Sequence, residues 1–414
     1  MKKRPVIASV AMSRPHSLAL AALFIVASLG GSVGQAGAAE QANSGYCPMV
    51  QNPAARKSCL DGRALFYNRN YRAALVTMKK ALDASPKEGI IRVIIARIMM
   101  TIDDMGAAER ELLQARKAGA PDHLVLPDLL HTMTLLHREN QVLVEFPEPA
   151  PGVKGDVAAD ILRGRAEALR SLNRLDEAGV AIDRSLSMRR DVPGLLERAN
   201  IASQQNKQAL ADELVDEAYR LDPKDGSALL AKLKQLQRSN DTAATLAFSQ
   251  QASKLFPDAI EPKMARIETY LKLKQDAKAK AEVNAILAKS PNSNFGRYYK
   301  ARLMMRANDK AGAWSVMLTV PSGFVKQNPS FAVPMAQLAL DNGKAEAAAS
   351  ILSNALAAAP DMLDVRLRFA SLRLSQDSPR SALSLLSPVK DSHDPQVQKL
   401  LGQVKARIAK DRAF

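Results

Sequence analysis

The chain has 414 residues, of which 47% are hydrophobic, 24% are charged and only 4% are aromatic. This composition excludes an intrinsically disordered chain, because enough apolar side chains are present for a sizeable core. The low aromatic content favours packed helices over a β-rich core, and the formal net charge of +16 favours acidic partners. A chain of this length forms either two or three globular domains or a repeat array, which needs no single large core.

The N-terminus, residues 1–38, has the three parts of a secretory signal peptide. A basic start with Lys2, Lys3, Arg4 and Arg14 precedes the apolar run LALAALFIVASL at 18–29, and the A-x-A sequence of residues 36–38 follows. Cleavage after Ala38 would leave a mature net charge of +12 in a periplasmic protein. An uncleaved N-terminal anchor is the alternative, although the apolar run is shorter than the ~20 residues of a spanning helix. No later segment approaches that length, so we expect no transmembrane segment in the mature chain.

The N-terminal segment of residues 39–54 contains Cys47, and the other cysteine of the chain is Cys59. In an oxidising compartment, two cysteines at this spacing favour a disulfide between Cys47 and Cys59. Two free thiols and a redox-active pair are the alternatives. Tyr46 precedes Cys47 where the signal of a lipoprotein requires a small residue, so we expect no lipid anchor.

Prolines follow helical runs at a constant interval of 34 residues, at Pro223, Pro257 and Pro291. Proline ends a helix because it lacks an N–H group and disfavours helical geometry in the preceding residue. The interval fits two antiparallel helices joined by a tight turn, such as NRL at 173–175. We therefore expect an N-terminal block of such units at 55–146 and a main array at 157–394. The Pro- and Gly-rich residues 147–156 form a linker between them, and the amphipathic residues 395–414 form a capping helix.

Small residues recur at three places in each unit, at positions 8, 20 and 27 when the proline is position 32. Complete sets are Ala199, Ala211, Ala218; Ala336, Ala348, Ala355; and Gly62, Ala74, Ala81. Positions 8 and 20 lie where the two helices cross, and a large side chain there would push the axes beyond 8–10 Å. This pattern resembles the tetratricopeptide (TPR) family, which has the same period and small positions. The resemblance implies an all-α, right-handed α-solenoid of about ten TPR helix–turn–helix units.

Three stretches carry a finer resemblance. MGAAERELLQARKAGAPDHLVLPDLLHTM (105–133), RGRAEALRSLNRLDEAGVAIDRSL (163–186) and YYKARLMM (298–305) are similar to the secreted TPR proteins of PEP-CTERM/exosortase exopolysaccharide systems. This resemblance implies a role in exopolysaccharide synthesis or export.

The TPR resemblance also implies that positions 5, 9, 12 and 13 of each unit face a concave groove. The candidate binding residues at these positions are Arg63, Tyr67, Arg163, Arg170, Asn200, Lys234, Arg238, Lys272, Tyr298, Arg302 and Arg306. Aligned cations attract an acidic partner, and arginine suits bidentate capture of a carboxylate. The alternative is that these side chains form solvated helix faces paired with neighbouring charges.

The sequence shows no catalytic, cofactor-binding or metal-binding pattern. His123, His131 and His137 are eight and six residues apart, which is not the i, i+4 spacing of HExxH. We therefore expect no enzyme, no cofactor and no metal. The favoured function is a scaffold that binds protein partners in the cell envelope. The alternative is direct binding of an acidic polysaccharide or acidic peptide in the basic groove. Nucleic acid is disfavoured as a partner because of the export signal.

Overall fold

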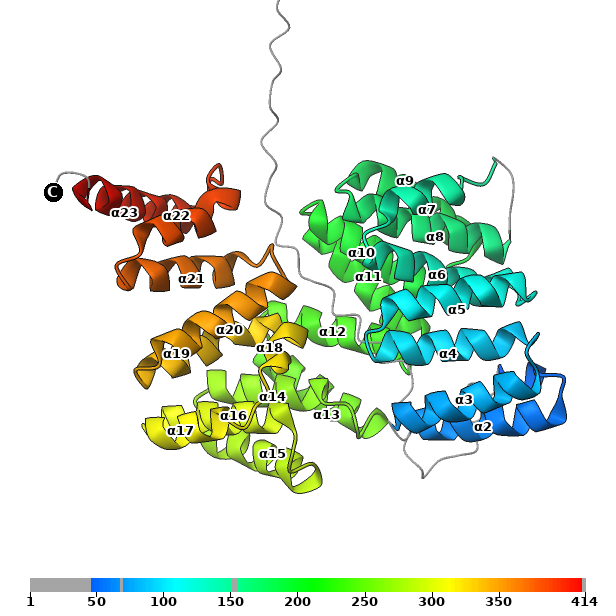
Figure 1. Cartoon of the computed structure of the whole chain (residues 1–414), viewed down its shortest axis with the longest axis horizontal. Helices are drawn as coiled ribbons and strands as arrows, with labels where there is room; N and C mark the ends of the chain where they lie inside the picture. The colour runs from blue at the N-terminus through cyan, green and yellow to red at the C-terminus, as the bar shows by residue number, and fades with distance from the viewer. Residues whose placement is uncertain (1–45, 68–69, 151–154, 412–414) are drawn as a thin grey trace, which may run out of the picture. The chain divides into compact units, whose positions relative to one another are not determined.

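The computed structural model describes residues 46–67, 70–150 and 155–411, and its regular structure is helical throughout these ranges (Figure 1). The predicted all-α solenoid is confirmed for this part of the chain. The predicted signal peptide lies outside the described residues, as do residues 39–45 and residues 151–154 of the linker. Two compact units divide the described chain, an N-terminal unit up to Thr269 and a C-terminal unit from Tyr270. The predicted linker lies inside the N-terminal unit.

The helices of the N-terminal unit form consecutive pairs after a 3₁₀ turn, η1 (Cys47–Met49). The first helices of the pairs are α2 (Pro53–Tyr67), α4 (Gly89–Thr101), α6 (Asp122–Leu135), α8 (Asp156–Ser171), α10 (Val192–Gln204) and α12 (Gly226–Arg238). Their second helices are α3 (Tyr71–Ala84), α5 (Met105–Lys117), α7 (Glu139–Glu145), α9 (Leu175–Met188), α11 (Gln208–Leu221) and α13 (Thr242–Leu255). The next helix, α14 (Glu261–Lys272), crosses the boundary between the units.

The C-terminal unit continues the same plan with one irregular stretch. Its helices are α15 (Asp276–Lys289), α16 (Asn294–Arg306), α17 (Lys310–Met317), α18 (Gly323–Gln327), η2 (Pro329–Phe331), α19 (Ala332–Asp341), α20 (Ala345–Ala358), α21 (Leu363–Ser375), α22 (Pro379–Leu386), η3 (Ser387–Val389) and α23 (Pro395–Asp411). None of the described helices in either unit is long and apolar enough to cross a membrane.

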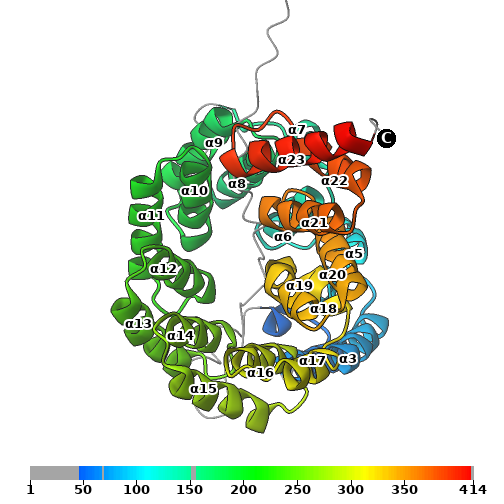
Figure 2. The same ribbon diagram turned by 90° about the vertical axis from the view of Figure 1, so that its left-hand side faces the viewer.

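Successive first helices pack directly against one another in the N-terminal unit. Helix α4 contacts α6, α6 contacts α8, α8 contacts α10, and α10 contacts α12. Each second helix packs between the first helix of its own pair and that of the next, as α9 does between α8 and α10; Figure 2 shows α10 to α13 following one another in this way. The first helices therefore line a common side of the unit, which we call the inner face.

The small residues of the 34-residue pattern are buried at the helix crossings, as predicted. Ala199, Ala211 and Ala218 are each at most 5% exposed. At Gly62, an added Cβ would lie 3.1 Å from Cε of Met78, so even alanine would crowd the contact between α2 and α3. Larger residues would separate the helices, which explains why Gly and Ala prevail at these positions. The unit that ends at Pro257 departs from the pattern, with buried Leu233 and Thr245 at positions 8 and 20.

From the α4–α5 pair to the α21–α22 pair, the turn inside each pair contains a residue with a left-handed backbone. Asparagine occupies this position at Asn173, Asn206, Asn240 and Asn308, with φ between 58° and 63°. In the Asn173 turn, the N–H of Arg174 donates to the carbonyl of Leu169 at 2.8 Å, which satisfies a carbonyl at the helix end. Asparagine tolerates this conformation better than most residues.

A disulfide joins Cys47 to Cys59, with an S–S distance of 2.04 Å, and so connects η1 to α2. Both cysteines are fully buried in a cluster with Ile91 and Ile95 of α4. The disulfide therefore fixes the start of the described chain to the first two helix pairs.

The last helix, α23, covers the end of the stack. Val397, Leu400, Leu401 and Val404 are buried against α21 and α22, and the solvent side of α23 is polar. This arrangement is that of a capping helix, whose apolar face shields the final pair from water.

Candidate interaction surfaces

A row of ion pairs crosses the inner face of the N-terminal unit from α4 to α10. Its members are Arg97 Nε with Asp128 Oδ2, His131 Nδ1 with Glu167 Oε1, and Arg170 Nε with Glu197 Oε1, each pair 2.6 Å apart. We call these six residues the inner ladder. Each pair joins one first helix to the next, so the ladder ties successive repeats together.

Burial and neighbouring charges act in opposite directions within the ladder. Burial opposes protonation of His131, but the charge and hydrogen bond of Glu167, together with the charges of Asp128 and Glu197, outweigh it. The pKa of His131 therefore lies above its ordinary value of 6.5. Burial also opposes ionisation of Glu167, yet His131 and the nearby arginines hold its pKa below 4.5. Burial raises the pKa of Glu197 despite the opposing charge of Arg170. The cations of the ladder thus face carboxylates, and this part of the inner face is not a free basic surface.

Arg163 belongs to a second cluster, at the start of α10. Its guanidinium donates to Asp160 Oδ1 at 2.8 Å and to Asp191 Oδ2 at 3.2 Å, and Arg189 Nε donates to Asp191 Oδ2 at 2.7 Å. The Asp160 side chain is only 1% exposed. Arg163 therefore connects α8 to the start of α10.

The other predicted residues of the N-terminal unit have different surroundings. The side-chain nitrogen of Asn200 lies 3.4 Å from Glu197 Oε2, and Arg238 pairs with Asp212. Lys234 is exposed, although crowding by the surrounding protein lowers its pKa. Arg63 is half-buried on α2, and the side chain of Tyr67 lies outside the described part of the chain.

In the C-terminal unit, Tyr298 corrects one expectation. Its ring is 2% exposed and packs edge-on against Phe331, with ring centres 4.6 Å apart, so it belongs to the core and is not accessible to a partner. The guanidinium of Arg302 lies over this ring, 5.5 Å from its centre. Arg306 Nη2 pairs with Asp276 Oδ1 at 2.8 Å, and Lys272 is exposed.

The structure thus brings Arg163, Arg170 and Asn200 together on α8 and α10, but in contact with acidic residues. Sequence reasoning missed Arg97 and placed no role on His131. A signal for both was present, because they follow Arg63 at successive intervals of 34 residues and so occupy the same repeat position.

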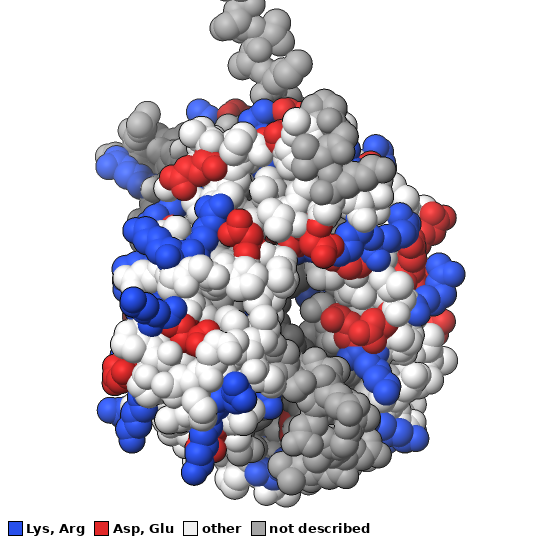
Figure 3. Space-filling view, turned by 90° about the vertical axis from the view of Figure 1, so that its right-hand side faces the viewer, with Lys and Arg blue, Asp and Glu red and all other residues white. Residues whose placement is uncertain are grey.

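Charge is nearly balanced over the N-terminal unit as a whole. Residues 46–269 contain 32 Lys and Arg and 30 Asp and Glu. On the face of the molecule shown in Figure 3, basic and acidic side chains lie interspersed. A broad basic surface is therefore not a property of this unit.

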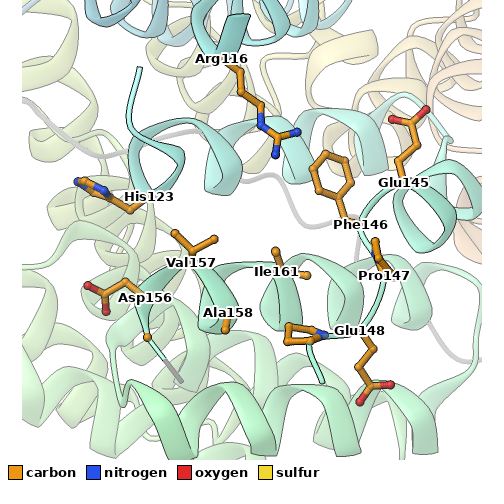
Figure 4. Close-up of a pocket in the computed structure, with 12 residues that line it drawn as sticks. Arg116, His123, Glu145, Phe146, Pro147, Glu148, Asp156, Val157, Ala158 and Ile161 are labelled. Carbon is orange, nitrogen blue, oxygen red and sulfur yellow. The ribbon is translucent and has the colours of Figure 1, made fainter. Parts of the chain in front are cut away.

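A cavity of about 690 Å³ lies where α7 is shorter than the other second helices (Figure 4). Arg116 and Phe146 lie on one side of it and Val157 and Ile161 of α8 on the other. Arg116 is engaged, since its Nε donates to Asp122 Oδ1 at 2.9 Å and its guanidinium lies 5.5 Å from the Phe146 ring centre. Within the described ranges, no cluster of His, Cys, Asp and Glu is arranged to hold a metal ion.

A tetratricopeptide repeat family model matches residues 339–404. Three solved structures resemble the chain: Tom70 of yeast (11% identity, 88% of this chain and 97% of that chain covered, TM-score 0.46), a tetratricopeptide repeat protein of Parabacteroides merdae ATCC 43184 (12%, 69% and 99%, 0.44) and PilF of Pseudomonas aeruginosa (16%, 52% and 97%, 0.34). No curated protein sequence matches this chain at a significant level. At these identities and TM-scores, the likeness supports no statement about function.

The family match covers the end of α19 and the helices from α20 into α23. The described pairs before this segment have the same helix–turn–helix arrangement, with the same buried small residues and left-handed turns. Residues 339–404 thus match a tetratricopeptide repeat model, and the helix pairs that precede them follow the same helix–turn–helix plan.

Proposed function

We propose that this protein is an exported scaffold that binds protein partners in the cell envelope and supports exopolysaccharide synthesis or export. The observation that carries the binding role is the repeat stack itself. Helix pairs follow one another from Pro53 to Leu386 within the described ranges. In such a stack each repeat contacts only the repeats next to it, so the stack leaves a long surface on which partners bind.

Two features support the proposed export to the periplasm. The sequence of residues 1–38 has the order of a signal peptide, with basic, apolar and small-residue parts. The Cys47–Cys59 disulfide then lies at the start of the described residues. Structural disulfides persist in oxidising compartments and are rare in the cytosol. The link to exopolysaccharide rests on the resemblance of residues 105–133, 163–186 and 298–305 to secreted TPR proteins of such systems.

Direct binding of an acidic polymer along a basic inner groove is less well supported. Arg163, Arg170, Arg238 and Arg306 each pair with a carboxylate of a neighbouring helix. An acidic ligand would have to displace these carboxylates, some of which are buried and would then lack a partner.

Export and partner binding are testable together in a strain that makes the chain with a C-terminal tag. We expect the envelope fraction to contain a protein that begins at Ala39, as the predicted cleavage after Ala38 requires, as determined by mass spectrometry of the N-terminal peptide. After mild cross-linking, a defined envelope protein should co-purify, and deletion of the gene should reduce secreted polymer. An intact Met1 terminus in the cytosol would overturn export, and unchanged polymer secretion would overturn the exopolysaccharide role.

A further inference from the structure

The excess positive charge of the chain is concentrated in one segment of the C-terminal unit. Residues 270–330 contain 11 Lys and Arg and only three Asp and Glu, so they carry +8 of the formal +16. The exposed cations of this segment are Lys272, Lys274, Lys278, Lys280, Lys289, Lys300, Arg306, Lys310 and Lys326. This segment forms the turn between α14 and α15 and the helices α15 to α18, of which Figure 2 shows α15, α16 and α17 in succession.

Two adjacent turns gather several of these cations. The pair between Arg306 Nη2 and Asp276 Oδ1, 2.8 Å apart, holds the turn between α16 and α17 beside the turn between α14 and α15. Lys274 and Lys278 flank Asp276 in the sequence, and Lys310 follows Arg306 by four residues. We call Lys274, Lys278, Arg306 and Lys310 the basic edge.

The acidic residues near the basic edge are already engaged. Asp276 accepts from Arg306, and Asp309 caps α17 by accepting from the N–H of Gly312 at 2.9 Å. Lys278 lies over the ring of Tyr270, 5.8 Å from its centre, and Leu273 is 40% exposed beside Lys274. The edge therefore combines the exposed positive charges of Lys274, Lys278 and Lys310 with a small apolar contact at Leu273.

Lys274 supplies a second, independent observation. It has φ 58°, in the left-handed position that asparagine occupies in four equivalent turns. A long side chain without local hydrogen bonding gains nothing from this conformation. Asp103, His137 and Asp377 have the same conformation in other turns, and Lys274 brings a permanent positive charge to this position. The turn thus holds an exposed cation at the basic edge.

We infer that the basic edge is a docking surface for an acidic, leucine-containing segment of a protein partner. The partner class rests on the proposed scaffold function, and the charge of the segment follows from complementarity to the edge. A sugar polymer fits less well, because Tyr298, Tyr299 and Phe331, which could stack on sugar rings, pack on one another in the core.

Fluorescence anisotropy with a labelled synthetic peptide of Glu and Leu tests this inference on the purified mature chain. The test variant is Lys274→Asn, Lys278→Gln, Lys310→Gln, and its first change introduces the residue of the equivalent turns, so the fold is kept. The matched control, Lys79→Gln, Lys80→Gln, Lys87→Gln, removes the same charge from exposed sites on and after α3. We expect the dissociation constant to rise about tenfold in the test variant and less than about twofold in the control, because contact charges act locally and are screened by salt.

Equal weakening in both variants, or no binding of the peptide even at low salt, would overturn the docking surface. Polygalacturonate and vesicles of anionic phosphatidylglycerol serve as further probes. If either bound through the three lysines while the peptide did not, the assignment to a protein segment would be wrong. The assay uses purified protein, so its outcome does not depend on export. A chain retained in the cytosol would refute the proposed function but would leave the measured peptide affinity unchanged.

Discussion

Nδ1 of His131 on α6 lies 2.6 Å from Oε1 of Glu167 on α8, and the pair bridges two repeats on either side of the linker. The side chains are 21% and 16% exposed. Helix α7 is only seven residues long, so the second-helix layer gives this junction less support than its neighbours. The ion pair and the close packing of α6 on α8 therefore hold the junction.

We predict that the junction weakens as the pH rises above neutrality. The pKa of His131 is raised in the folded state. The stabilisation that its charge contributes is therefore complete below about pH 6.5 and is lost as the pH rises through the pKa of the folded state. The pKa of Glu167 is lowered from 4.5 in the folded state. The stabilisation that its charge contributes is therefore present above pH 4.5 and is lost as the pH falls through the pKa of the folded state. The pair should be strongest between about pH 4.5 and 6.5.

Hydrogen exchange of the α6 and α8 amides, corrected for intrinsic rates, measures this effect. The change His131→Gln should lower local stability by about 1–3 kcal/mol at pH 6, because it leaves Glu167 half-buried without its cation. The same change should abolish the decrease in the local stability of α6 and α8 between pH 6 and pH 8. Replacement of the exposed His123 by Gln is the control and should change neither. A pH dependence that survives in His131→Gln would contradict this role.

A second prediction concerns the contact of α6 with α8 at Gly164. An added Cβ there would lie 2.6 Å from the Cβ of Leu130, which is fully buried. Gly164→Ala should therefore destabilise the N-terminal unit by about 1–3 kcal/mol, through overpacking. In Gly179→Ala, the new Cβ would lie 4.0 Å from its nearest neighbour, and the better helix propensity of alanine should make this change neutral or stabilising. Urea denaturation measures both, and equal effects would show that the α6–α8 contact is not tight.

The disulfide should stabilise the first helix pair. Replacing Cys47 and Cys59 together by Ala removes a cross-link over 12 residues, for which chain entropy predicts a loss of roughly 2–4 kcal/mol. Because each repeat contacts only its neighbours, we expect α2 and α3 to exchange and to be cleaved by protease before the later helices. Reduction of the wild-type chain should reproduce the result. Unaltered protection of α2 in both samples would show that packing around Ile91 and Ile95 suffices.

Substitution of two lysines by asparagine, at Lys274 and at Lys280, should change the stability of the C-terminal unit in opposite directions. Lys274→Asn should stabilise the C-terminal unit by up to about 1 kcal/mol, because asparagine relieves the left-handed strain. Lys280→Asn, on the exposed side of α15, should instead destabilise it by a few tenths of a kcal/mol through lower helix propensity. Thermal unfolding distinguishes the two, and a destabilised Lys274→Asn would mean that the lysine makes a structural contact.

The period of the prolines and small residues was sufficient to predict the fold, because helix length and crossing distance depend on local sequence. Between Pro53 and Glu145 the structure has three helix pairs, of which the last, α6 with α7, has a short second helix. The inner ladder was not predictable in this way. Whether Arg170 faces solvent or Glu197 depends on how far one first helix is shifted along the next, which no single repeat encodes. In the irregular α17–α18 stretch, α17 ends at Met317 and Pro321 lies between the two short helices.

Site-specific photocross-linking in cells tests the proposal that this chain binds a protein partner through the basic edge. A benzophenone amino acid would replace Lys274 or Lys310 in turn, with Lys80 on α3 as the control position. We predict that positions 274 and 310 cross-link to the same envelope protein, within a segment rich in Asp and Glu, and that position 80 does not. Cross-links absent at 274 and 310, or equally frequent at 80, would contradict it.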